Sequence, residues 1–265
     1  MRRAIVISRA DPVSMGIAEI LIESFNFSIR EGIYRKGEVE LHFIDEKHIY
    51  AEMIGERLGV DLVVFPSSHK SEKGIQAFLT HAVGNWRDEA SYGGRPRKLS
   101  KTSALMLRKS LQTLLEEVGS LRIDGWDVRL EVTHHGPFTE VPTIFVEVGG
   151  DENSTPGEKE LEVVATASLK AAETEIRKDE EVAIGFGGGH YAPTFTKLVA
   201  NGSYNIGHMC PKYALPIDRE VVREAIEKIV EKTTQALIDW KGIPSDYRRT
   251  LVNILESYGL EIVKT

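Results

Sequence analysis

Cysteine is nearly absent from this chain, and Cys210 alone cannot form a disulfide within it. Because no Cys-x-x-Cys site exists, a bound metal ion would need histidine and carboxylate ligands. The lack of disulfides is typical of the reducing cytoplasm, where we expect the protein to act. No apolar run approaches the roughly 18 residues of a membrane-spanning helix, so we expect no membrane segment. Gly-x-Ser-x-Gly and Gly-Lys-Ser/Thr motifs are also missing, which argues against such serine hydrolases and against P-loop nucleotidases.

Acidic residues are missing from residues 90–115, although the whole chain has a net charge of −7. The cations of this stretch are Arg95, Arg97, Lys98, Lys101, Arg108 and Lys109. A basic patch on an acidic protein is typical of a site for nucleic-acid phosphates. The alternative is a solvated loop and helix face without a partner, and charge alone does not decide between them.

The order of apolar segments predicts the fold. With 265 residues and 42% hydrophobic residues, the chain can form one α/β domain spanning residues 1–265. Strands and helices alternate, which predicts a mixed, mostly parallel sheet with helices on both faces. We expect strands at 4–8, 38–44, 61–66, 75–83, 128–132, 143–148, 182–185, 204–208 and 260–264, helices at 11–25, 51–58, 102–118, 158–175, 194–200, 218–234 and 246–258, and loops at 67–74 and 85–101.

Three consecutive glycines, Gly187, Gly188 and Gly189, follow the expected strand at 182–185 and precede His190. Glycine backbone adopts positive φ and allows a ligand to approach closely. We therefore predict that these glycines bind substrate and that His190 acts as an acid or base. The competing interpretation is a tight turn with a surface histidine.

Histidines follow several expected strands, where sites form in α/β sheets. These residues are His69, His81, the pair His134 and His135, His190 and His208. We predict that they meet at one edge of the sheet, with His81 contacting substrate. His42 and His48 lie in charged surroundings and are predicted to be on the surface, while Trp86 is expected to fill the core rather than to stack on a base.

A zinc site is the chemistry that these residues favour. His69 and Glu72 have a His-x-x-Glu spacing, so both can reach one ion from a turn, and His135, His190 or His208 can complete the set. We choose His69, Glu72 and His135 as metal ligands. Taken alone, the spacing is equally consistent with a hydrogen-bonded loop histidine at position 69.

His135 and Glu147 are the remaining catalytic candidates. Neighbouring strand residues point to opposite faces, so one histidine of the pair is expected to serve the site. We choose His135 and give His134 a supporting role. Glu147 closes the strand at 143–148, where it can bind metal, orient a histidine or act as a general base. A solvent-facing strand position is an equally good explanation for Glu147.

Four blocks of sequence carry a family resemblance. They are Phe65-Pro66-Ser67-Ser68-His69-Lys70-Ser71, Leu79-Thr80-His81-Ala82-Val83-Gly84-Asn85-Trp86, Thr133-His134-His135-Gly136-Pro137 and Gly185-Phe186-Gly187-Gly188-Gly189-His190-Tyr191-Ala192-Pro193. Together they resemble the archaeal and plant type of D-aminoacyl-tRNA deacylase, over most of the chain. The resemblance supplies no assigned catalytic residue, so the site assignments rest on the residues themselves.

The resemblance implies an enzyme that hydrolyses the ester between a D-amino acid and the terminal ribose of tRNA. It also implies a zinc cofactor and an α/β core similar to phosphorylase and zinc-carboxypeptidase folds. Arg95, Arg97, Lys98 and Lys101 then become candidate tRNA contacts, and we expect a monomer without an obligate protein partner. The alternatives are a zinc-dependent carboxypeptidase-like enzyme or amidohydrolase acting on a small substrate, and a non-catalytic module that binds tRNA ends.

Overall fold

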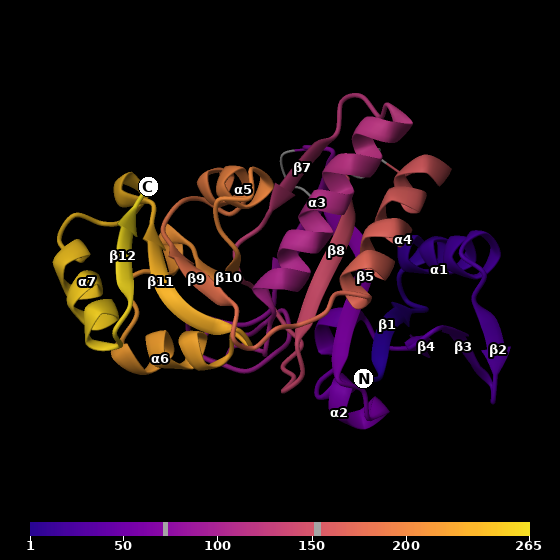
Figure 1. Cartoon of the computed structure of the whole chain (residues 1–265), viewed down its shortest axis with the longest axis horizontal. Coiled ribbons are helices and arrows are strands. Elements are labelled where there is room, and N and C mark those ends of the chain that lie inside the picture. The colour runs from indigo at the N-terminus through magenta and orange to yellow at the C-terminus, as the bar shows by residue number, and fades with distance from the viewer. Residues whose placement is uncertain (71–73, 151–154) are drawn as a thin grey trace.

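Two β-sheets lie side by side in the computed structural model, which describes residues 1–70, 74–150 and 155–265 (Figure 1). The larger sheet has the strand order β2-β3-β4-β1-β5-β8-β6-β7 and the smaller has the order β10-β9-β11-β12. The strands are β1 (Arg3–Ser8), β2 (Ser28–Arg30), β3 (Ile33–Lys36), β4 (Val39–Ile44), β5 (Leu62–Lys70), β6 (Ala77–Ala82), β7 (Asp127–Leu130), β8 (Thr143–Gly150), β9 (Glu181–Phe186), β10 (Ile206–Cys210), β11 (Lys232–Ile238) and β12 (Glu261–Lys264).

The larger sheet is parallel at its centre, where β4, β1, β5 and β8 run in one direction. β6 pairs antiparallel with β8 and parallel with β7. Three long helices pack on one face, namely α1 (Pro12–Ser24), α3 (Ala104–Leu121) and α4 (Glu158–Ala172). The short helices η1 (His48–Tyr50) and α2 (Ile54–Leu58) cover part of the opposite face. The rest of that opposite face carries the polar pocket described below.

The smaller sheet is entirely parallel. Helices α6 (Arg219–Glu227) and α7 (Arg248–Ser257) pack on one face, and α5 (Pro193–Ala200) packs on the other. The 3-10 helices η2 (Lys212–Ala214) and η3 (Trp240–Gly242) complete the list of elements. Helix α3 joins the two sheets, because Leu107 packs in the core of the larger sheet and Leu111 packs against Ile206 and Met209.

The structure confirms the predicted class, a mixed α/β fold with a large, mostly parallel sheet and helices. The division into two sheets and the hairpin of β2 and β3 were not predicted. The helix expected over 218–234 was wrong at its end, because α6 stops at Glu227 and β11 starts at Lys232. Thr233 and Thr234 are β-branched and favour this strand, which pairs on both sides. None of the helices in the described part of the chain is both long and apolar enough to cross a membrane.

Candidate active site

A pocket of about 480 Å³ lies against the larger sheet and is lined mainly by polar side chains. β5 contributes Ser67 and His69, and β8 contributes Phe145 and Glu147. Residues two apart in a strand face the same side, and Ser67 pairs in register with Glu147, so these side chains share one face. The loop predicted for 67–74 was therefore wrong at its start, because β5 continues to Lys70. The pocket is also lined by residues that follow the ends of the parallel strands β1 and β4, among them Asp11 and His48, so it lies over the carboxyl ends of these strands.

Glu147 is buried and accepts two hydrogen bonds on the pocket face. Ser67 Oγ donates to Oε1 at 2.7 Å, and His69 Nδ1 lies 3.3 Å from Oε2. Burial would raise the pKa of Glu147, but His69 and His81 outweigh it and hold the pKa well below its usual value. Burial likewise opposes protonation of His69, yet Glu147 and Glu131 raise the pKa of this imidazole. The solvent-facing interpretation of Glu147 is thus wrong, and its carboxylate is ionised at neutral pH.

His81, His134 and His135 direct one ring nitrogen each toward a common point. Their Nδ1 atoms lie 2.9, 2.8 and 2.6 Å from the carbonyl oxygens of Ala82, Val132 and Gly136. Carbonyl oxygens only accept hydrogen bonds, so each Nδ1 carries the proton and each neutral ring keeps a free lone pair on Nε2. One nitrogen from each ring lies within 4.8 Å of the others. Three ring nitrogens at this spacing could hold a metal ion, and two further groups of the described residues could do the same: Glu131 with His134 and His190, and His69 with Glu131 and Glu147.

The three rings differ in their tendency to take up a proton. Burial lowers the pKa of His135 to about 3, and it lowers the pKa of His134 well below the ordinary value. For His81, burial also favours the neutral ring, but the carboxylates of Glu147 and Glu131 prevail and raise its pKa. The neighbouring carboxylates thus favour a proton on His81, whereas burial favours the neutral form of His134 and His135.

Glu131 is a site residue that the sequence reasoning missed. It is fully buried, and neither of its carboxylate oxygens makes a hydrogen bond. His190 Nε2 lies 3.1 Å from Oε1, while His69 Nδ1 and His81 Nε2 each lie 4.0 Å from one of the two oxygens. Burying a carboxylate without hydrogen bonds is costly, so a cation is the natural partner. The available signal was its position one residue before the end of the predicted strand at 128–132 and two residues before Thr133.

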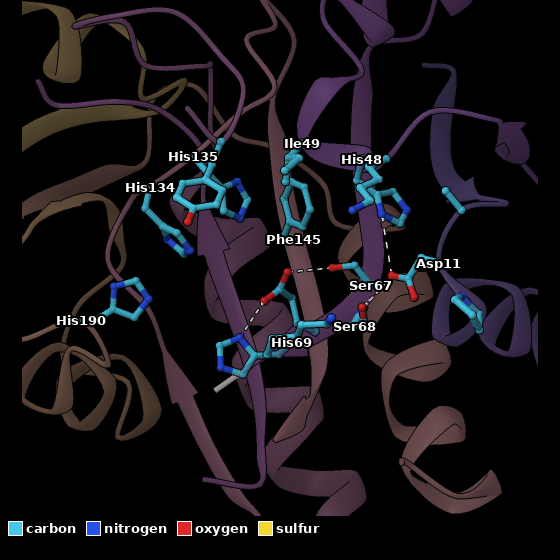
Figure 2. A pocket seen from close by; sticks show the side chains of 16 residues that line it. Asp11, His48, Ile49, Ser67, Ser68, His69, His134, His135, Phe145 and His190 are labelled. Atoms are coloured by element: carbon cyan, nitrogen blue, oxygen red, sulfur yellow. Dashed lines mark hydrogen bonds and ion pairs between the residues drawn. The ribbon is translucent and has the colours of Figure 1, made fainter. Parts of the chain in front are cut away.

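His190 and His134 lie on one side of the pocket, and His48 and Asp11 lie on the other, with Phe145 between them (Figure 2). His190 is partly exposed, and its Nδ1 lies 2.9 Å from the hydroxyl of Tyr213. Burial raises the pKa of Tyr213 to about 12, so the phenol keeps its proton. His190 thus connects the buried Glu131 with the solvent-facing side of the pocket.

Both histidines of the pair line the pocket, so the expected division of roles between His134 and His135 was wrong. β7 ends at Leu130, and His135 has a φ of 43°, so the side chains do not alternate as in a strand. His208 does not join the cluster. Its Nε2 donates to the carbonyl of Ser100 at 3.0 Å, and its Nδ1 lies 3.1 Å from the hydroxyl of Thr133.

His48 and His42 are not surface residues, contrary to expectation. His48 is buried, and its Nε2 accepts a hydrogen bond from the backbone N–H of Ser8 at 3.1 Å. His42 is largely buried, 2.8 Å from the carboxylate of Glu40. The charged neighbour Glu40 is thus an ion-pairing partner of His42, whereas His48 is held by Ser8 and Ser14. Trp86 is buried and donates to the carbonyl of Thr133 at 3.0 Å, as expected for a core residue.

The predicted metal set and glycine site are only partly assembled. His69 and His135 line the pocket, and Glu72 lies outside the described residues. Gly187 and Gly188 have positive φ values of 101° and 79°. A Cβ at Gly187 would lie 2.8 Å from the carbonyl of Asp239, so this turn packs against the segment after β11. Gly187, Gly188 and Gly189 do not line the pocket, whereas His190 does.

The predicted basic patch is largely paired with carboxylates. Arg95 lies 3.5 Å from Glu52, Arg97 pairs with Asp218, and Lys98 lies 2.9 Å from Glu224. Asp218 caps α6 and Glu224 lies within it, so Arg97 and Lys98 attach the loop to the smaller sheet. Lys101 is half-buried, with backbone hydrogen bonds to Thr139 and Thr143. Arg95, Arg97 and Lys98 are therefore neutralised within the molecule, whereas Lys101 has no carboxylate partner among the described residues.

The fold and the pocket define an α/β enzyme with a histidine- and carboxylate-lined active site. The family model described as D-aminoacyl-tRNA deacylase matches residues 56–263. The chain is 32% identical over 275 residues to the D-aminoacyl-tRNA deacylase of Pyrococcus abyssi, covering 99% of each chain. It is 35% identical over 263 residues to that of Picrophilus torridus, covering 98% of each. This chain belongs to the D-aminoacyl-tRNA deacylase family.

The fold is shared with a solved structure. The crystal structure of a conserved protein of unknown function, AF0625, superposes with a TM-score of 0.88 at 28% sequence identity. The match covers 99% of this chain and 95% of that chain. The arrangement of two joined sheets therefore occurs in a second protein of similar length.

Proposed function

We propose that this protein hydrolyses the ester bond of D-aminoacyl-tRNA and releases a free D-amino acid and tRNA. Family membership supports the reaction. The structural observation that carries the proposal is the cluster of three imidazoles, of which His134 and His135 line the pocket, beside the buried carboxylate of Glu131. A pocket of about 480 Å³ is within the range of small-molecule sites and is large enough for an aminoacyl group.

The residues present fit a zinc ion. His81, His134 and His135 would hold it through nitrogen, with the unbonded oxygens of Glu131 adjacent. When bound, zinc polarises a carbonyl oxygen and lowers the pKa of water to about 7. This assignment keeps His135 from the predicted ligand set and replaces His69 and Glu72 with His81 and His134. His69 instead orients the carboxylate of Glu147 through the hydrogen bond between them.

The side chains of the pocket account for the remaining steps. Water adds to the ester carbonyl, the bond to the ribose oxygen breaks, and that oxygen takes up a proton. Glu147 is ionised and fixed by Ser67 and His69, so it orients the water and accepts its proton. His190 is the partly exposed imidazole of the cluster, so it donates the proton to the leaving ribose oxygen.

The test is release of amino acid from D-tyrosyl-tRNA and L-tyrosyl-tRNA, measured side by side with the metal-loaded protein. We expect release from the D-ester only. Equal release from both esters would contradict the proposed chirality. No release from either, together with cleavage of a small peptide or amide, would favour the carboxypeptidase-like alternative instead.

A further inference from the structure

Tyr92 is an exposed aromatic side chain at the mouth of the pocket. It lines the pocket together with His135 and Ile49, yet 70% of its surface is exposed. Among the large hydrophobic side chains of the described residues, it is the most exposed. The catalytic cluster does not use it. An exposed ring beside a substrate pocket is typical of a recognition surface.

The backbone of Tyr92 is fixed although its ring is free. Gly136 N–H donates to the carbonyl of Tyr92 at 3.0 Å, and the side chain of Asn85 donates to the carbonyl of Gly93 at 2.9 Å. A Cβ at Gly93 would lie 1.8 Å from the carbonyl oxygen of Ile49. The ring therefore projects from a tightly packed junction and lines the pocket together with His135, Ile49 and Phe145. Such pre-organisation lowers the entropic cost of binding.

The reaction places a nucleobase at this position. If the protein acts on aminoacyl-tRNA, as proposed above, the ester carbonyl lies in the pocket and the ribose lies next to it. The adenine on that ribose must then lie at the pocket mouth. We propose that Tyr92 stacks on the 3′-terminal adenine of tRNA and positions the ester. Stacking on an aromatic ring does not depend on the rest of the tRNA sequence, and every tRNA offers this terminal adenosine.

Lys47 lies at the same pocket mouth and can contact the phosphate next to the terminal adenosine. Lys47 lines the pocket, its side chain is exposed, and it has no ion-pair partner among residues 1–70, 74–150 and 155–265. It differs in this respect from Arg95, Arg97 and Lys98, which are paired with carboxylates. A stacked base and an adjoining phosphate contact together describe a site for the single-stranded end of tRNA.

A binding experiment tests the stacking without requiring turnover. The dissociation constants of uncharged tRNA and of the same tRNA shortened by its terminal adenosine are measured for the wild-type protein, Tyr92→Ala and Tyr92→Phe. We expect loss of the adenosine to weaken wild-type and Tyr92→Phe binding about ten-fold, and to leave Tyr92→Ala almost unaffected. If removal of the adenosine weakened tRNA binding equally in all three proteins, the inference would be overturned.

Kinetics and a matched control separate stacking from support of the loop. Tyr50→Ala removes another exposed ring, which packs beside Gly93 but does not line the pocket. We expect Tyr92→Ala to raise KM for D-tyrosyl-tRNA about ten-fold with unchanged kcat, and Tyr50→Ala to behave as the wild type. Neither variant should affect hydrolysis of D-tyrosine ethyl ester, which has no base. The stacking would be overturned if Tyr92→Ala and Tyr50→Ala raised KM for D-tyrosyl-tRNA equally. It would also be overturned if Tyr92→Ala slowed hydrolysis of the ethyl ester as much as that of the tRNA ester. Adenosine-dependent binding without any deacylation would support it and refute the proposed function.

Discussion

Two regions of this protein bury histidine in opposite ways. His81 is fully buried, whereas His134 and His135 line the pocket; each of the three makes one hydrogen bond through Nδ1 to a carbonyl oxygen and keeps a second nitrogen available. His208, in the smaller sheet, uses both nitrogens, one with Ser100 and one with Thr133. A fully paired imidazole stabilises the fold, whereas converging unpaired nitrogens await a ligand. The comparison shows that hydrogen-bond completion, rather than burial, separates a structural histidine from a functional one.

The largest expected effect is on turnover in His135→Ala, because this substitution removes one of the converging nitrogens. Partners one step away from a metal ion already contribute about 10- to 100-fold, so we expect deacylation to fall by more than about 100-fold. His208→Gln is the control, since it replaces a buried histidine that lies outside the cluster. We expect this control to retain bound zinc and most of its turnover per folded molecule. Wild-type activity in His135→Ala would contradict its role in the site. Loss of zinc from both variants would contradict the distinction between His135 and His208.

Much of the site could be predicted from the sequence, because its histidines and one glutamate lie in short motifs at the ends of apolar segments. His69, His135, His190 and Glu147 were found in this way, and all of them line the pocket. His208 was predicted to join them because it lies in a strand, but Thr133 and Ser100 satisfy it from segments far away in sequence. A sequence does not show which buried group is already paired.

Glu131 was missed for a related reason. An acidic residue in a strand that alternates with charged neighbours is typical of a solvated face, whereas Glu131 is buried beside His69, His81 and His190, which come from distant segments. The second sheet was missed because β11 follows α6 with few residues between them, so both were assigned to one helix. Long-range pairing, which local patterns do not encode, decided both cases.

Glu131→Gln tests the pocket side of the comparison, because it removes a charge next to the histidine cluster with little change in side-chain shape. Glu131 is buried beside His69, His81 and His190, so removing its charge should weaken zinc binding at this cluster. We expect zinc affinity to fall about 10- to 100-fold, as measured by competition with a chelator. A variant that binds zinc as tightly as the wild type would show that Glu131 has no part in the site.

His208→Gln tests the structural side of the comparison through pH. Burial lowers the pKa of His208 from its ordinary 6.5 to about 3, so between these values the unfolded chain binds the extra proton. The contribution of His208 to stability is therefore complete above pH 6.5 and declines as pH falls toward 3, by about 1.4 kcal/mol per pH unit. Urea unfolding from pH 7 to pH 4 should show a shallower decline for His208→Gln than for the wild type. Parallel declines would contradict the assignment.

The smallest effect is expected from reversing the charges of Arg97 and Lys98, which we predicted to contact tRNA and which the structure pairs with Asp218 and Glu224. Exposed pairs contribute about 0.2–1 kcal/mol each, so Arg97→Glu with Lys98→Glu should lower stability only modestly. If these residues also bind phosphate, KM for D-tyrosyl-tRNA rises and its salt dependence becomes shallower. An unchanged KM at all salt concentrations would limit Arg97 and Lys98 to joining the loop to α6.

The most direct test of the central claim is deacylation of D-tyrosyl-tRNA by the same preparation before chelation, after chelation and after addition of zinc. The converging nitrogens of His81, His134 and His135 predict that chelation abolishes D-specific release, that circular dichroism shows a folded protein throughout, and that zinc restores activity. Full D-specific activity in protein shown by elemental analysis to be free of metal would contradict this account and leave catalysis to Glu147 and His190 alone.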